Sequence, residues 1–134
     1  MPNDRRSFLR FLTIVGAAIA PGLTGLPRPE GERLMYGLIA KLTASPGSRD
    51  ELTAILEKGT RNMPGCFSYI LAKDAADENI LWVTEIWDSA ASHDASLTLP
   101  AVKDAIARGK PLIAAFERVA ATNPVAGVGL PSSH

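Results

Sequence analysis

The side chains best suited to chemistry lie in one short stretch, from Ile80 to Pro100. It contains both tryptophans and His93, the only histidine apart from the C-terminal residue. An imidazole is a natural general base because its ordinary pKa of about 6.5 lies close to neutral pH. Glu85 and Trp87 precede His93 closely, so an acid, an indole and an imidazole could meet at one small pocket. Any chemistry of this chain is therefore expected near this stretch.

A strand and a helix must position these groups. Residues 80–87 alternate in a pattern that is largely apolar on both faces, as in a strand that is covered on both sides. Glu85 and Trp87 then share one face of that strand. Ser89 can cap a following helix, which carries His93 above the same face and continues until Pro100 breaks or restarts it.

The remaining patterns complete a βαββαβ order. Strands are expected at residues 34–42, 66–73 and 116–122, with a hairpin loop at 74–79. Ser48 and Glu51 predict a capping box at the start of the first helix, and a second apolar helical stripe follows Pro100. This order predicts an α+β fold, a ferredoxin-like antiparallel sheet of the dimeric α/β-barrel type. Alternation in the second strand places Phe67 and Tyr69 on one face and Cys66 on the other.

Two helices can cover only one face of such a sheet. Ile80, Trp82 and Ile86 would then form an apolar patch on the other face. Large exposed apolar patches mark association surfaces, so we expect a homodimer that packs sheet to sheet.

Composition narrows the class of protein. The chain has 134 residues, of which 46% are hydrophobic, enough for the core of one domain. Its 14 basic and 14 acidic residues balance, and no basic block follows the first ten positions, so no nucleic-acid partner is expected. The lone Cys66 excludes an internal disulfide and any multi-cysteine metal site.

The N-terminus differs in kind from the rest. Arg5 and Arg6, followed by Phe8 and Leu9, precede an uncharged apolar run at residues 11–20 and then a Pro/Gly-rich stretch. This pattern is typical of an export signal of the twin-arginine type. The run is too short to span a bilayer. We therefore expect residues 1–30 to be a signal and linker, 31–126 the folded domain and 127–134 a flexible tail, in an exported, periplasmic protein that meets the membrane only through its signal.

Several motifs together resemble a known family, the antibiotic biosynthesis monooxygenases with their quinol monooxygenase-like members. They are Pro64-Gly65-Cys66 through Tyr69, Glu85-Ile86-Trp87-Asp88-Ser89, His93, Leu97, Pro100 and Asn123-Pro124-Val125. Their order and spacing extend over nearly the whole domain. Many relatives carry two further histidines, at the positions that are Ser96 and Ala101 here.

The resemblance implies oxygen chemistry on a small aromatic substrate with no metal, flavin or other cofactor. Such enzymes deprotonate a phenol or hydroquinone, which then passes an electron to O₂. On this basis His93 is the expected base, and Glu85 would orient the imidazole or a substrate hydroxyl. The expected aromatic walls are Trp87, Tyr36, Phe67 and Tyr69.

Other interpretations remain open. His93 could face solvent or simply bond a carboxylate, and Glu85 could pair with Arg118 or Lys41 across the sheet. The missing histidines favour a non-catalytic, small-ligand-binding or stress-related dimer of the same fold. A haem-binding or haem-degrading relative ranks behind both, because the first strand has no Asn and Leu97 stands at the matching helix position.

Overall fold

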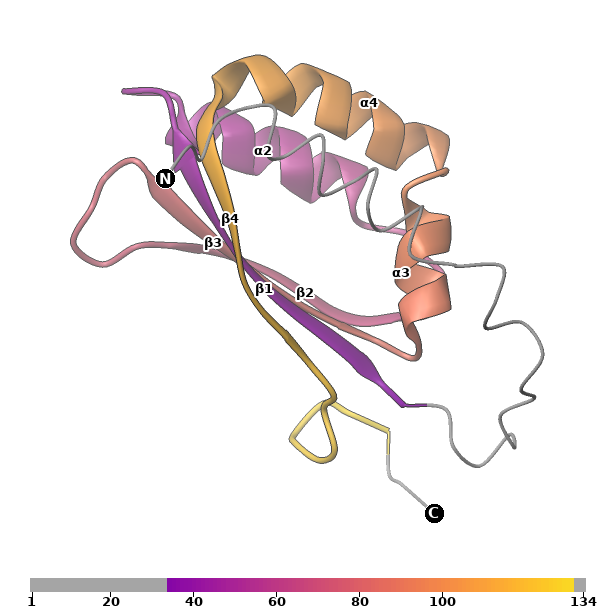
Figure 1. Ribbon diagram of the computed structural model, residues 1–134. Helices are drawn as coiled ribbons and strands as arrows, with labels where there is room; N and C mark the ends of the chain where they lie inside the picture. Colours follow the sequence, from indigo (N-terminus) through magenta and orange to yellow (C-terminus); the bar gives the residue numbers. More distant parts are fainter. Residues whose placement is uncertain (1–33, 132–134) are drawn as a thin grey trace, which may run out of the picture.

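The computed structural model describes residues 34–131, so the predicted export signal lies outside the described residues. The elements follow one another as βαββααβ, with the second helical region divided in two (Figure 1). They are β1 (Tyr36–Ala44), α2 (Arg49–Gly59), β2 (Cys66–Lys73), β3 (Ile80–Trp87), α3 (Ala90–Ser96), α4 (Pro100–Gly109), a 3₁₀ turn (Lys110–Leu112) and β4 (Ile113–Thr122). The predicted α+β, ferredoxin-like fold is confirmed.

The four strands form one antiparallel sheet in the order β2-β3-β1-β4. All three helices lie on one face of this sheet, and in the described residues the other face carries no helix (Figure 1). The core fills the space between the sheet and the helices. It has two parts, a larger one under α2 and a smaller one around Met63, Trp87 and Val102.

The two central strands follow from their sequences. β3 occupies the predicted residues, and its odd-numbered Leu81, Val83 and Trp87 are buried toward the helices. The even-numbered residues of β3 lie on the open face and are half-buried. β1 begins at Tyr36 and ends at Ala44, two residues later at each end than predicted.

The helix starts differ in their chemistry. Ser89 caps α3 as predicted, because its side chain accepts a hydrogen bond from the Ser92 backbone N–H. The predicted capping box at Ser48 is wrong. Ser48 has φ −104° and ψ −1° and makes no side-chain cap hydrogen bond. This backbone is already near-helical, whereas a capping side chain normally extends from β-region backbone. Pro100 restarts the helix as the first residue of α4.

Both edge strands, β2 and β4, are irregular, and in β2 the irregularity changes which side chains share a face of the sheet. In β2, Cys66 pairs with Trp87 while Ser68 pairs with Ile86, so Phe67 is an extra residue in a bulge. Cys66 therefore packs with Trp87 on the helix-covered face, and the prediction that it lies opposite Tyr69 is wrong. β4 begins at Ile113, three residues earlier than predicted, and it is also irregular opposite β1.

No helix in the stretch from residue 34 to 131 combines the length and apolarity that a membrane crossing requires.

Candidate functional site

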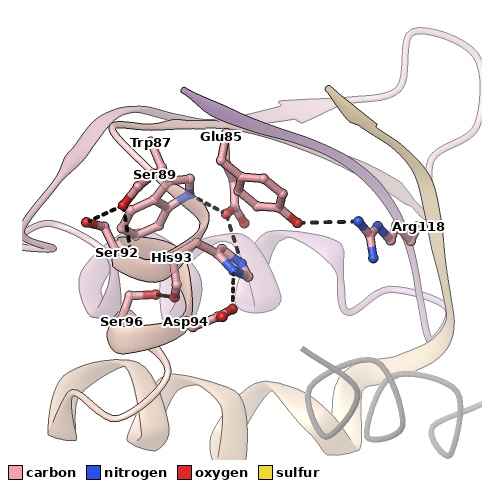
Figure 2. Close-up of polar contacts among 9 residues, drawn as sticks. Glu85, Trp87, Ser89, Ser92, His93, Asp94, Ser96 and Arg118 are labelled. Atoms are coloured by element: carbon pink, nitrogen blue, oxygen red, sulfur yellow. Dashed lines mark hydrogen bonds and ion pairs between the residues drawn. The ribbon is translucent and has the colours of Figure 1, made fainter. Parts of the chain in front are cut away.

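Glu85 lies at the centre of the candidate site, on the helix-covered face of β3. Its Oε2 accepts a hydrogen bond from Trp87 Nε1 at 2.9 Å and lies 3.6 Å from His93 Nε2 (Figure 2). Trp87 shares this face because it follows Glu85 by two residues in the strand. Only 11% of the Glu85 side chain is exposed, and burial raises the pKa of its carboxyl to about 7, although the indole hydrogen bond opposes the rise.

His93 packs directly above this carboxylate from α3. It is 4% exposed, so the alternative that it faces solvent is wrong. Its Nδ1 lies 3.4 Å from Asp94 Oδ1, so a carboxylate stands on each side of the imidazole (Figure 2). The Trp87 ring meets it edge to face at 5.5 Å between centroids. Burial lowers the pKa of His93, with Asp94 acting in the opposite direction.

These two shifts bring the pKa values of Glu85 and His93 closer to each other. An ordinary glutamic acid loses its proton well before a histidinium ion does. Here the pKa of Glu85 moves up toward neutrality and that of His93 moves down from 6.5. Groups this close titrate as a pair, and the pair can take up or release a proton near neutral pH.

The two tyrosines border this pair. The Tyr36 ring lies 5.2 Å from the His93 ring, and Tyr69 stands opposite Glu85 in the β2–β3 ladder. Loss of water on burial is the main cause that raises the pKa of both hydroxyls, and the Glu85 charge adds to it. The structure therefore brings together five of the six predicted site residues: Tyr36, Tyr69, Glu85, Trp87 and His93.

Phe67 is the exception, because the β2 bulge takes it out of the regular ladder, and it is 40% exposed. It lines a hollow of about 570 Å³ between β2 and α2 together with Tyr69, Cys66 and Met63. Glu85 and His93 do not line this hollow. The predicted wall residue thus lies in a neighbouring depression, and Tyr69 is common to both places.

Sequence reasoning missed three polar contacts of the site. Arg118 of β4 donates to the Tyr36 hydroxyl at 3.4 Å, whereas the sequence suggested it only as a partner of Glu85. Asp94 follows His93 directly and could have been weighed as its partner. The Ser96 hydroxyl donates to the His93 backbone carbonyl at 2.6 Å.

The other suggested partner of Glu85 lies elsewhere. The Lys41 ammonium sits 5.9 Å from the Trp82 ring centroid on the open face of the sheet. A pairing of Glu85 with Lys41 is therefore wrong. Across residues 34–131, no group of three or more His, Cys, Asp and Glu side chains is arranged to hold a metal ion.

Comparison with known proteins agrees with this fold. Residues 35–108 match the model of the family described as antibiotic biosynthesis monooxygenase. The chain belongs to the antibiotic biosynthesis monooxygenase family. A comparison with curated proteins gave no match.

Solved structures give the same family and fold. A crystal structure of a candidate antibiotic biosynthesis monooxygenase from Chloroflexus aurantiacus is 57% identical, with a TM-score of 0.68, over 69% of this chain and 95% of that one. A Mycobacterium tuberculosis protein is 25% identical with a TM-score of 0.58, over 70% and 98% of the two chains. A candidate family member from Caulobacter crescentus, 24% identical with a TM-score of 0.60 over 70% and 92%, shares the fold.

Proposed function

We propose that this monooxygenase-family protein oxidises a quinol or another polyphenol with O₂ and needs no cofactor. One observation carries the proposal. A buried carboxyl and a buried imidazole stand 3.6 Å apart next to aromatic side chains, with the pKa of the carboxyl raised to about 7 and that of the imidazole lowered. A general base works best when its pKa lies near the working pH, and the raised pKa of Glu85 provides a proton acceptor of that kind beside the imidazole.

The first chemical step is removal of a proton from the substrate hydroxyl. A phenol has a pKa of about 10, so at neutral pH it must be ionised by a base within hydrogen-bonding distance. His93 accepts this proton through Nε2, and Glu85 stabilises the imidazolium ion that forms. The indole N–H holds the carboxylate in place from its other side.

The phenolate then reacts with O₂. One electron passes from the ring to O₂, and the resulting superoxide recombines with a ring carbon ortho or para to the oxygen that carries a hydrogen, forming a peroxide. The O–O bond breaks with loss of the ring proton. One oxygen remains as the second quinone carbonyl, and the other leaves as water. The aromatic side chains Trp87 and Tyr36 pack around the imidazole and limit water there, which keeps the peroxide from hydrolytic side reactions.

Oxygen uptake tests this function. Domain spanning residues 30–134, treated with a chelator, should consume O₂ above the autoxidation rate with some member of a panel of hydroquinones and catechols. His93→Ala should lose about a hundredfold of that rate, and added imidazole should restore part of it. Lys103→Ala, an exposed change on α4, is the control. Equal rates in folded wild type and His93→Ala would contradict the proposed base.

A ligand-binding role is the second candidate. The Ser96 hydroxyl bonds its own helix at the position where many relatives carry another histidine, so the site has a single imidazole. Tight binding of aromatic compounds without oxygen uptake in any of them would favour this role. A Soret shift on haem titration would instead indicate the haem-binding alternative.

We also propose a homodimer that packs through the open face of the sheet. Ile39, Trp82 and Ile86 are half-buried on that face, and Ile70 is 54% exposed. Ile86→Lys should convert a dimer to a monomer in light scattering. Val128→Lys, in the exposed segment after β4, should leave the mass unchanged. A monomeric wild type would contradict this arrangement.

We also propose export to the periplasm, from the paired arginines and the apolar run that follows them. In cells, replacing Arg5 and Arg6 with lysine should retain the full-length chain in the cytoplasm. Equal periplasmic amounts of both forms would contradict the twin-arginine route.

A further inference from the structure

One arginine of β4 lies on the same face of the sheet as the candidate site. Arg118 pairs with Ala40, but Ala120 pairs with the preceding Ile39, so Val119 is an extra residue between them. Residues directly opposite in an antiparallel ladder share a face, and Ala40 is buried under the helices. The register is regular from the Leu42–Phe116 pair to the Ala40–Arg118 pair, so Arg118 lies on the same helix-covered face as the buried Phe116. The extra residue Val119 follows Arg118, and a cationic side chain therefore stands on the face of the sheet that carries the site.

The arginine reaches a tyrosine on the same face. Tyr36 and Ala40 are both even-numbered residues of β1, and the Arg118 Nη2 donates to the Tyr36 oxygen at 3.4 Å. The Tyr36 ring in turn lies 5.2 Å from His93. Arg118 is exposed, Tyr36 is half-buried and His93 is buried, so the three side chains lead from solvent to the pair formed by Glu85 and His93.

We propose that Tyr36 and Arg118 are the groups that bind the oxyanion of the substrate. The substrate class follows: phenols that ionise readily, or aromatic compounds with a second anionic group. This inference rests on the proposed function for the reaction, but the binding it describes can be measured without turnover.

The donor arrangement supports anion binding. Because the guanidinium donates to the Tyr36 oxygen, the tyrosine O–H can itself donate to a substrate oxygen. A hydrogen bond to a charged acceptor is stronger than one between neutral groups, and the guanidinium remains charged at every working pH. The Arg118 charge also lowers the pKa of Tyr36, against the larger effect of burial.

The Arg118 charge is important because two carboxylates lie close to the proposed anion site. Glu85 and Asp94 both face this region and raise the pKa of Tyr36, so they would repel a phenolate. Arg118 lowers the pKa of His93, so its charge is felt at the imidazole. The cation offsets the two carboxylates at the point where a substrate anion would form.

A phenol that changes colour on ionisation provides the test. 4-Nitrophenol is electron-poor and resists oxidation by O₂, and its phenolate absorbs at longer wavelength than the phenol. Binding to the domain should lower its pKa. Arg118→Gln and Tyr36→Phe should each weaken phenolate binding about tenfold and raise the pKa of the bound probe by about one unit. Arg118→Lys should restore part of the effect, because it keeps the charge without the planar donor fork.

The control is Arg108→Gln on α4, where another exposed arginine pairs with Asp104 away from the site. It should bind the probe like the wild type. Wild-type affinity in both Arg118→Gln and Tyr36→Phe would overturn the inference, as would a wild-type domain that leaves the probe pKa unchanged.

The two proposals fail in different ways. Probe binding that depends on Arg118, without oxygen uptake for any substrate, would reject the reaction and keep the anion site. Oxygen uptake that depends on His93 but not on Arg118 or Tyr36 would keep the proposed reaction and reject the anion site.

Discussion

The chain has two tryptophans, and each donates its indole N–H to a carboxylate, yet the pKa values of the two carboxyls are shifted in opposite directions. Trp87 Nε1 donates to Glu85 at 2.9 Å on the helix-covered face, and Trp82 Nε1 donates to Asp74 at 2.7 Å on the open face. The pKa of Glu85 is raised to about 7, whereas that of Asp74 is lowered to about 2. The same hydrogen bond therefore accompanies opposite shifts.

Burial explains the difference. Asp74 is solvated and also accepts the backbone N–H groups of Ala76 and Asp77, so its charged form is favoured. Glu85 is buried among Trp87, Tyr69 and His93, and desolvation outweighs the bond from the indole. Burial disfavours the charged form of Glu85, and this carboxyl lies beside an imidazole. A carboxyl with a raised pKa in that position is suited to proton transfer.

The largest expected contrast is in turnover. Glu85→Gln keeps the shape of the side chain but removes the ionisable group beside His93, so oxygen uptake should fall by about a hundredfold or more. Asp74→Asn makes the same chemical change in the solvated pair and should leave the rate unchanged. Similar losses in both variants would mean that the effect comes from folding rather than from the site.

The pH dependence of stability should differ between the two acids. The pKa of Glu85 is about 7 in the folded state against an ordinary value of 4.5, so the folded state holds the extra proton between these values. This stabilisation is complete below pH 4.5 and is lost as pH rises through 7, a change of roughly 3 kcal/mol. Urea unfolding at pH 5 and pH 8 measures this effect. The free energy of unfolding of the wild type, minus that of Glu85→Gln, should be smaller at pH 8 than at pH 5.

Asp74 should show the opposite sign in a lower window. Its folded pKa of about 2 lies below its ordinary value of 3.8, so its stabilisation is present above pH 3.8 and is lost as pH falls toward 2. His93, whose pKa is lowered, loses its contribution as pH falls below 6.5 and partly offsets Glu85. A wild-type minus Asp74→Asn difference that changed between pH 5 and pH 8 would contradict the assignment.

The smallest expected contrast is in packing. Trp87 is 1% exposed, so Trp87→Phe should cost about 2 kcal/mol through the lost indole volume and hydrogen bond. Trp82→Phe on the half-buried face should cost less than about 1 kcal/mol. Urea unfolding at one pH compares them, and equal losses would mean that a partner surface covers the open face as fully as the helices cover the other.

Regular alternation made much of this structure predictable. β3 and its two faces follow directly from the period-two pattern of residues 80–87, and that pattern placed Glu85 and Trp87 together. Ser89 and Pro100 marked the starts of α3 and α4 because each has a local capping or first-turn role. The motifs near His93 also identified the family, which the family match confirms.

The errors come from local irregularity that alternation cannot reveal. Because of the β2 bulge, Cys66 lies on the face opposite to the predicted one and Phe67 leaves the regular ladder, and β4 has a second bulge at Val119. A bulge changes the face of every residue beyond it, yet neither strand carries a glycine or proline to mark one. The raised pKa of Glu85 also could not be predicted from the sequence, because it depends on how completely the helices exclude water from the carboxyl.

A titration of the Glu85 carboxyl itself examines the proposed proton-sharing pair. Carbon-13 NMR of side-chain carboxyl groups in labelled protein, with Glu85→Gln for assignment, follows its protonation. We expect one carboxyl that titrates near pH 7 and is absent from the variant. A Glu85 signal that titrates near its ordinary value of 4.5 would contradict the proposed proton-sharing pair.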